Sequence, residues 1–177
     1  MSKKVNRIQE DWEKTKNELN DAKADSRNAV EEIKGSISIV QAAAFLAHNI
    51  KNKAPSNGET LVFSTTNFDV GSGYNNKTGI YVTPVAGIYI FTVQLCISSH
   101  KYVVFEIDTT NGPILKGRFI DDGDRYSGCQ TATAVAELDI KEHVLIKSGP
   151  SSGGIDLQKD SYTWNSFSGA LISTVTK

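Results

Sequence analysis

The chain has 177 residues, of which 39% are hydrophobic and 22% charged, a composition that is ordinary for a globular protein. Its formal net charge is -1, whereas a protein that follows the phosphates of a nucleic acid normally carries a basic excess, so nucleic acid is not an expected partner. The longest apolar run, near residues 87–97, is about half the ~20 residues that a membrane-spanning helix needs, and no membrane span is predicted.

A long helix is predicted for residues 1 to about 36. This segment has no proline, and no glycine before Gly35. Mostly apolar or small residues recur at alternating steps of three and four, which is the 3.5-residue period of a coiled coil. These positions are Val5, Ile8, Trp12, Thr15, Leu19, Ala22, Ser26, Ala29, Ile33, Ser36 and Val40. We therefore predict an α-helical coiled-coil stalk over residues 1–38.

Charges beside this heptad stripe predict parallel, in-register helices. With Val5 at position a, Lys16 and Lys23 occupy e positions, each five residues after an acidic g position. Asp11 of one copy could then pair with Lys16 of its neighbour, and Glu18 with Lys23. The next two e positions are apolar, which suits three helices better than two. The alternative is a lone amphipathic helix packed back on its own head.

From about residue 40 the pattern predicts an all-β head. Short apolar alternations are separated by Gly, Asn, Asp and Ser turns, which is typical of an antiparallel β-sandwich or jelly roll. Strands are predicted at residues 87–97, 103–107, 131–138 and 166–173. The segment 148–154, SGPSSGG, is predicted to be a flexible loop between two strands. The head is assigned to residues 40–177.

The densest run of reactive side chains is the acidic turn, residues 121–126 (DDGDRY). Three carboxylates around a glycine could hold calcium through oxygen ligands, although the distal glutamate of a calcium loop is absent. Carboxylates, a guanidinium and a tyrosine ring can also engage sugar hydroxyls. A solvated acidic turn is the alternative. The candidate ligand-binding residues are Asp121, Asp122, Asp124, Arg125 and Tyr126, with calcium as a candidate cofactor.

Catalysis finds little support in the sequence. His48, His100 and His143 lie far apart, and no hydrolase, zinc-protease or nucleotide-binding motif is present. Cys96 and Cys129 could form a disulfide, remain free thiols or include a reactive thiol. The sequence alone leaves these alternatives open, and it predicts a binding protein rather than an enzyme.

The head resembles the complement C1q globular-domain family. The resemblance is carried by Ala44-Phe45-Leu46-Ala47, Val62-Phe63, Gly71-Ser72-Gly73-Tyr74, Thr78-Gly79-Ile80-Tyr81, Pro84, Gly87-Ile88-Tyr89-Ile90-Phe91, Val144 and Phe167-Ser168-Gly169-Ala170-Leu171-Ile172. Departures from the family pattern are Asp69 for Asn, Tyr81 for Phe, Thr83 for Cys, and Lys141-Glu142-His143 for Gly-Asp-x. None of them places an incompatible polarity in the core.

The resemblance implies a ten-stranded jelly roll that forms tight trimers and functions outside the cell. It implies recognition of microbial carbohydrate, other surface patterns or receptors, and calcium near the trimer axis in many members. The chain has no collagen-like Gly-x-x repeat, so the coiled coil replaces the collagen stalk of other members. This arrangement is similar to that of short C1q-domain lectins of invertebrates, especially molluscs.

The localisation remains open at the level of residues alone. The amino terminus is charged where a signal peptide would have an apolar centre, so the chain is either intracellular or a mature or recombinant form without its leader. The resemblance favours the second interpretation. Asn76-Lys77-Thr78 is a glycosylation sequon, which matters only in a protein secreted by a eukaryotic cell.

The leading hypothesis is a secreted homotrimeric lectin-type binder of carbohydrate or microbial surfaces in innate immunity. A trimeric ligand for a protein receptor and a structural component of the extracellular matrix are the alternatives. Specificity would reside in exposed loops of the head, with the acidic turn as the first candidate and the loop at residues 148–154 as the next.

Overall fold

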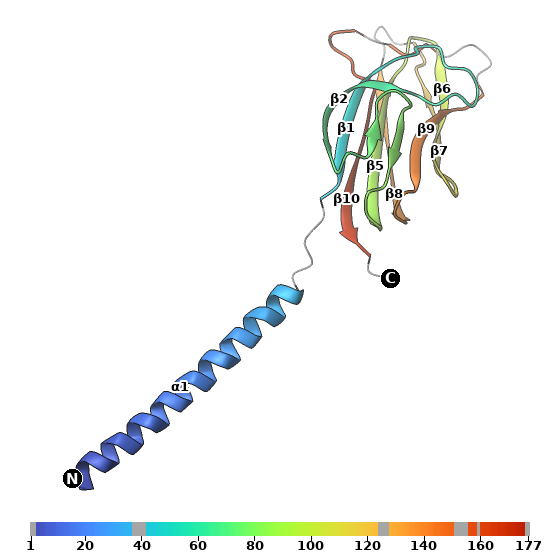
Figure 1. The fold of residues 1–177 in the computed structure, drawn as a ribbon. Coiled ribbons are helices and arrows are strands. Elements are labelled where there is room, and N and C mark those ends of the chain that lie inside the picture. The colour runs from blue at the N-terminus through green and yellow to red at the C-terminus, as the bar shows by residue number, and fades with distance from the viewer. Residues whose placement is uncertain (1–2, 37–41, 124–127, 151–155, 159, 176–177) are drawn as a thin grey trace. The chain divides into compact units, whose positions relative to one another are not determined.

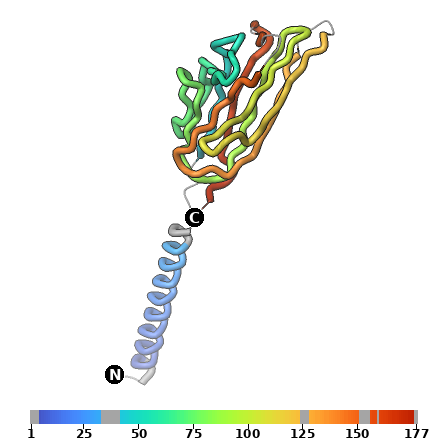
Figure 2. The backbone as a smooth tube through the Cα atoms, turned by 90° about the vertical axis from the view of Figure 1, so that its right-hand side faces the viewer, coloured from blue at the N-terminus to red at the C-terminus, as the bar shows by residue number. Residues whose placement is uncertain are grey.

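The computed structural model describes residues 3–36, 42–123, 128–150, 156–158 and 160–175. The chain divides into two compact units, Met1–Val40 and Gln41–Lys177. Among the described residues, the first unit contains one helix and the second contains ten strands. Figures 1 and 2 show the backbone of both units. Within the described ranges, we find no helix that combines the length and the apolar character needed to cross a membrane.

Helix α1 (Lys3–Ser36) leaves its apolar seam exposed. The large apolar side chains described on it are 46–64% exposed. They are Val5, Ile8, Trp12, Leu19 and Val30. On the polar side, Lys14 lies 3.9 Å from Glu18. Burial of a long amphipathic helix's apolar side is its main source of stability, so this unit has an unburied surface suited to a partner helix.

The second unit is a sandwich of two five-stranded antiparallel sheets. The first sheet has the order β2-β1-β10-β5-β8 and the second has the order β3-β4-β9-β6-β7. The strands are β1 (Ala44–Ile50), β2 (Phe63–Val70), β3 (Tyr74–Asn75), β4 (Ile80–Val82), β5 (Gly87–Cys96), β6 (Tyr102–Thr109), β7 (Gly112–Ile120), β8 (Cys129–Leu138), β9 (His143–Ser148) and β10 (Ser166–Thr174). The predicted all-β jelly-roll head preceded by a helix is confirmed.

Aromatic side chains from both sheets fill the space between the sheets. Phe45 of β1 stacks on Tyr81 of β4 with ring centroids 4.6 Å apart, and meets Phe167 of β10 edge-on at 4.9 Å. Gly169, on the same side of β10, lies against Phe91, where an added Cβ would come within 2.6 Å of the ring. This position therefore needs glycine for close packing rather than for an unusual backbone angle.

The strand predictions agree with the structure except at their ends. The segment predicted at 131–138 begins two residues earlier, at Cys129, and the segment predicted at 166–173 extends by one residue as β10. The predicted loop at 148–154 overlaps the last residue of β9, and its residues 151–154 lie outside the described part of the chain.

Strand directions define two ends of the sandwich. β1 and β5 end, and β8 and β10 begin, at the end marked by Ile50, Cys96, Cys129 and Ser166, which we call the apical end. The chain enters β1 and leaves β10 at the opposite end (Figure 1). The acidic turn also follows β7 at the apical end, because Ile120 is the register partner of Tyr102 at the start of β6.

Candidate functional site

A disulfide joins two neighbouring strands at the apical end. Cys96, the last residue of β5, and Cys129, the first of β8, are register partners with Cα atoms 3.9 Å apart. Of the alternatives left open by the sequence, the structure shows the disulfide. The bond holds the ends of two adjacent strands together at the edge of the first sheet, so the loops that follow start from a fixed frame.

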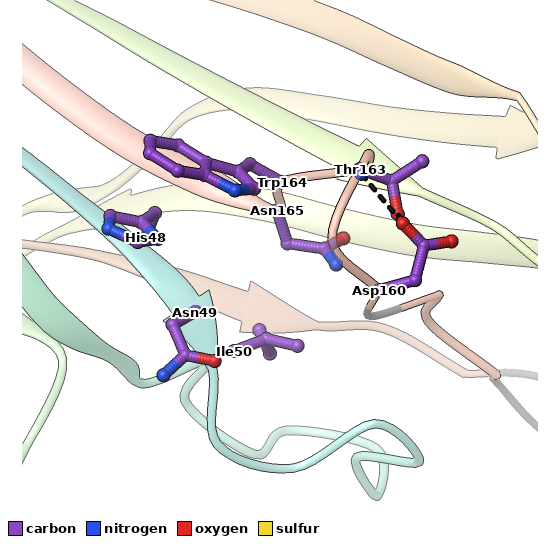
Figure 3. Close-up of a pocket in the computed structure, with 7 residues that line it drawn as sticks. All are labelled: His48, Asn49, Ile50, Asp160, Thr163, Trp164 and Asn165. Atoms are coloured by element: carbon purple, nitrogen blue, oxygen red, sulfur yellow. Dashed lines mark hydrogen bonds between the residues drawn. The ribbon is translucent and has the colours of Figure 1, made fainter.

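A small hollow opens beside this frame, between the end of β1 and the segment that precedes β10. We call it the apical hollow. Its lining residues are His48, Asn49, Ile50, Asp160, Thr163, Trp164 and Asn165 (Figure 3). It encloses about 110 Å³, well below the ~300–1,000 Å³ typical of sites for drug-sized ligands. It can therefore accept one small ring or the tip of a larger molecule.

The aromatic side of the hollow is a stacked pair. The indole of Trp164 and the imidazole of His48 are nearly parallel, with an interplanar angle of 4° and centroids 3.9 Å apart. Trp164 nevertheless remains 48% exposed. Its carbonyl accepts a 2.8 Å hydrogen bond from Nε2 of Gln94 on β5. The tryptophan is thus held in one orientation while presenting apolar surface to solvent.

Asn165 anchors the loop beneath the tryptophan. It is 2% exposed, and its Oδ1 accepts a 2.8 Å hydrogen bond from the backbone N–H of Cys96. Its Nδ2 donates to the carbonyl of Gln158 at 2.5 Å. Because both ends of the side chain amide are already bonded, we assign Asn165 to the frame of the hollow rather than to ligand contact.

Asp160 organises the polar side of the hollow. Its Oδ1 accepts a hydrogen bond from the backbone N–H of Tyr162 at 2.7 Å. It also accepts from the backbone N–H of Thr163 at 2.8 Å and from the Thr163 hydroxyl at 3.0 Å, and Figure 3 shows Asp160 and Thr163 side by side. The bond from the Tyr162 backbone, followed by that from the Thr163 side chain, holds the pKa of Asp160 below its ordinary value. The carboxylate is therefore ionised at neutral and mildly acidic pH.

Asn49 continues the polar lining from the other strand. Its φ of 68° lies in the left-handed region, which asparagine tolerates better than most residues. Its carbonyl accepts a 2.8 Å hydrogen bond from the Ser64 hydroxyl, and its Nδ2 donates to Oγ1 of Thr65 at 3.2 Å. These bonds tie Asn49 to β2 and fix its place at the edge of the hollow.

The acidic turn is only partly described. Asp121 is 9% exposed, and its two carboxylate oxygens accept hydrogen bonds from the backbone N–H groups of Gly123 at 3.0 Å and Gly128 at 2.8 Å. Asp122 is exposed. Asp124, Arg125 and Tyr126 lie outside the described residues. Asp121 therefore closes the turn, and the ligand-binding role of all five predicted residues remains a prediction.

A calcium site remains a prediction as well. In the described part of the chain, no group of three or more His, Cys, Asp or Glu residues is arranged to hold a metal ion. The three histidines follow the expected pattern of separate surface or strand positions, but His48 also contributes a wall of the apical hollow.

The sequence analysis did not select His48 and Trp164 as a site. A signal was present, because Tyr162 and Trp164 place two aromatic residues in a polar segment just before a strand. Pairing Trp164 with His48 required the register of β1 on β10, in which His48 lies opposite Ser166. That register cannot be read from either strand alone.

Comparisons with known proteins agree on the head. The family model described as C1q domain matches residues 44–172. The solved globular domain of zebrafish complement 1qA protein is 20% identical, with a TM-score of 0.57, and the match covers 76% of this chain and 99% of that one. Murine APRIL at pH 8.0 is 12% identical with a TM-score of 0.55, covering 74% and 98%. A search of curated proteins found no match.

The hydrogen bonds of Asp121 give a test of its structural role. We expect Asp121→Ala to lower the free energy of unfolding by about 1–3 kcal/mol, because two partly buried N–H groups lose a charged acceptor. Exposed Asp122 is the matched control, and Asp122→Ala should change stability by no more than about 0.5 kcal/mol. Urea unfolding at fixed protein concentration measures both. Equal effects of the two substitutions would contradict the assignment.

Proposed function

The chain belongs to the C1q-domain family, and from this we propose that it is a secreted homotrimer that binds carbohydrate on microbial surfaces. In this proposal the protein is a lectin-type pattern-recognition molecule of innate immunity rather than an enzyme. The stalk and the head both contribute to the trimer, and the apical ends of three heads carry the binding sites.

The observation that best supports the proposed trimer is a row of apolar residues on the outer face of the first sheet. In the strand register, Val70, Ala44, Ala170, Ile90 and Val135 lie side by side across all five strands. Val70 and Val135, at the two edges, are each about half exposed. The neighbouring Phe68 lines a hollow on the same face. A continuous exposed apolar surface of this kind typically marks a protein–protein interface.

The exposed seam of α1 supports a coiled-coil stalk over residues 1–38. Val5, Trp12 and Leu19 occupy a positions of the heptad and Ile8 a d position, and all are exposed in the isolated helix. A second and third copy would bury them as knobs in a parallel coil. Polar core positions such as Thr15 weaken the coil, so the head's own interface is expected to contribute to assembly.

The carbohydrate proposal fits the presentation of three equal sites. Each apical hollow is small, so a single site is expected to bind weakly. Three sites on one rigid particle can raise overall avidity by about 10²–10⁴-fold for a repetitive surface without any new contact. Microbial polysaccharides are repetitive surfaces of this kind.

The outer-face row predicts how assembly can be broken. Light scattering of the full chain should give about three times the 19.3 kDa monomer mass. Val70→Asp with Val135→Asp should lower this mass, because charges would be buried at the interface, while circular dichroism of the head stays unchanged. Ile140→Asp is the control, since Ile140 is 57% exposed but lies between β8 and β9. A wild-type mass of 19.3 kDa would refute the trimer.

The stalk makes a separate prediction about charge pairing. Asp11→Lys with Glu18→Lys should lower the melting temperature of the helix, and adding Lys16→Glu with Lys23→Glu should restore it, at about 0.3–0.5 kcal/mol per pair. Lys16 also lies 3.8 Å from Glu13 in the same helix. If this pair within one helix dominates, adding Lys16→Glu should lower the stability further instead of restoring it. Far-UV circular dichroism distinguishes them. A quadruple variant less stable than the double would exclude the proposed register.

Carbohydrate binding itself is tested on an array of microbial polysaccharides, with calcium and with a chelator. We expect the intact trimer to bind at least one polysaccharide, and the Val70→Asp, Val135→Asp variant to bind it much more weakly because avidity is lost. Loss of binding in chelator would assign a calcium site to the trimer. No binding to any polysaccharide would contradict the lectin function.

A further inference from the structure

We propose that the apical hollow is a subsite for a neutral sugar ring, which stacks on Trp164 and hydrogen bonds to the polar side of the hollow. This inference rests on the proposed lectin function and locates its site. It differs from the sequence-based prediction, which placed ligand binding on the acidic turn.

The first argument is that Trp164 is exposed and yet held in a fixed orientation. A side chain that only closed the end of the sandwich would be buried, yet the indole is 48% exposed and its orientation is fixed by His48 on one ring face. Rigid aromatic side chains provide binding surface at low entropic cost. The C–H groups on one face of a pyranose form an apolar surface that fits against such a ring.

The second argument is the chemistry of the polar side. Among the described residues, the hydrogen bonds to Asp160 end on Oδ1, so Oδ2 can accept from a ligand hydroxyl. The Thr163 hydroxyl adds a further acceptor on the lining. Sugar hydroxyls can donate to these oxygens. The hollow thus combines an aromatic side chain with oxygen acceptors, the two kinds of group that bind a sugar ring.

The third argument is charge, which narrows the ligand class. Asp160 is ionised at neutral pH, and its pKa is held below the ordinary value by its hydrogen bonds and by the charge of Lys53. Lys53 does not line the hollow, and no lysine or arginine is found among the described residues that do. An anionic ligand would meet a like charge there. The site therefore suits a neutral hexose or N-acetylhexosamine unit and not a phosphorylated, sulfated or sialylated sugar.

The experiment uses the tryptophan itself as a reporter. The chain has two tryptophans, Trp12 in the stalk and Trp164 in the hollow, so Trp12→Phe leaves Trp164 as the sole emitter. This variant is titrated with laminarin, yeast mannan and chitin oligosaccharides in the presence of a chelator. We expect at least one of these to change the Trp164 emission in a saturable manner, and a sialylated oligosaccharide to leave it unchanged.

Substitutions then separate the hollow from other apical surfaces. In the wild-type background, Trp164→Ala should weaken binding to the responding polysaccharide by about tenfold or more. Asp160→Asn should also weaken it, because a neutral amide replaces a charged acceptor. Tyr162→Ala is the matched control from the same loop, because Tyr162 is 93% exposed but does not line the hollow, and Asp122→Asn is the control for the acidic turn. Both controls should bind within about twofold of wild type.

His48 is assigned as a positioning residue for Trp164. His48→Ala should weaken binding and His48→Phe should retain it, because a flat ring restores the stack. A role in stability alone would alter unfolding without this pattern of rescue in sugar binding.

The outcomes are distinct. If the array shows polysaccharide binding but the Trp164 emission is silent and Trp164→Ala binds as wild type, the apical hollow is not the site, while the lectin function stands. If Asp122→Asn abolishes that binding, the acidic turn is the site. If the wild-type trimer binds no polysaccharide, both the lectin function and this subsite are refuted.

Discussion

Both the fold and the apical hollow depend on the core contacts of Phe167. It is fully buried and meets Phe45 at 4.9 Å and Phe91 at 6.1 Å, so it joins β10 to β1 and β5 through the core. Two and three residues earlier in the chain, Asn165 and Trp164 form the frame and the aromatic wall of the hollow. Phe167 fixes the start of β10 in the core, and the hydrogen bonds of Asn165 and Trp164 to β5 extend this support to the exposed tryptophan.

Alternating side chains of β10 contribute to two surfaces, the core and the outer face of the first sheet. In β10, Phe167 and Gly169 face the core, while Ala170 belongs to the outer-face row that we assign to assembly. Because side chains alternate with a period of two, a one-residue shift in register would exchange these surfaces. Gly169 opposes such a shift, since a larger residue could not fit against Phe91. Core packing therefore also determines which apolar residues are left for a partner chain.

The sequence predicted what depends on periodicity and could not predict what depends on register. Alternation in residues 87–97 identified a core strand, and the glycine and aromatic spacings around Gly73, Gly79 and Phe167 identified the family. Cys96 and Cys129 stayed ambiguous because their pairing follows from β5 lying beside β8. The stack of His48 on Trp164 was missed for the same reason, since the two lie on different strands and meet only through β1 and β10. For Asp121, carboxylate density predicted ligand binding, which stays a prediction, but did not predict that this side chain accepts two backbone hydrogen bonds that close the turn.

The departures from the family pattern show where the chain can vary. Thr83 is fully buried, accepts a hydrogen bond from the N–H of Glu142 at 2.9 Å and donates to the carbonyl of Asp139 at 2.5 Å, so it remains satisfied in the place where a Cys is common. Tyr81 differs in that its hydroxyl is buried, and this burial raises its pKa. Both departures lie in the buried interior of the head and leave its fold intact. Variation at the apical end is different in kind, because Trp164 and Asp160 contribute exposed groups to a hollow and are not needed to fill the core. In the subsite that we propose, ligand specificity can therefore change by substitution in the segment before β10 without altering the packing that Phe167 maintains.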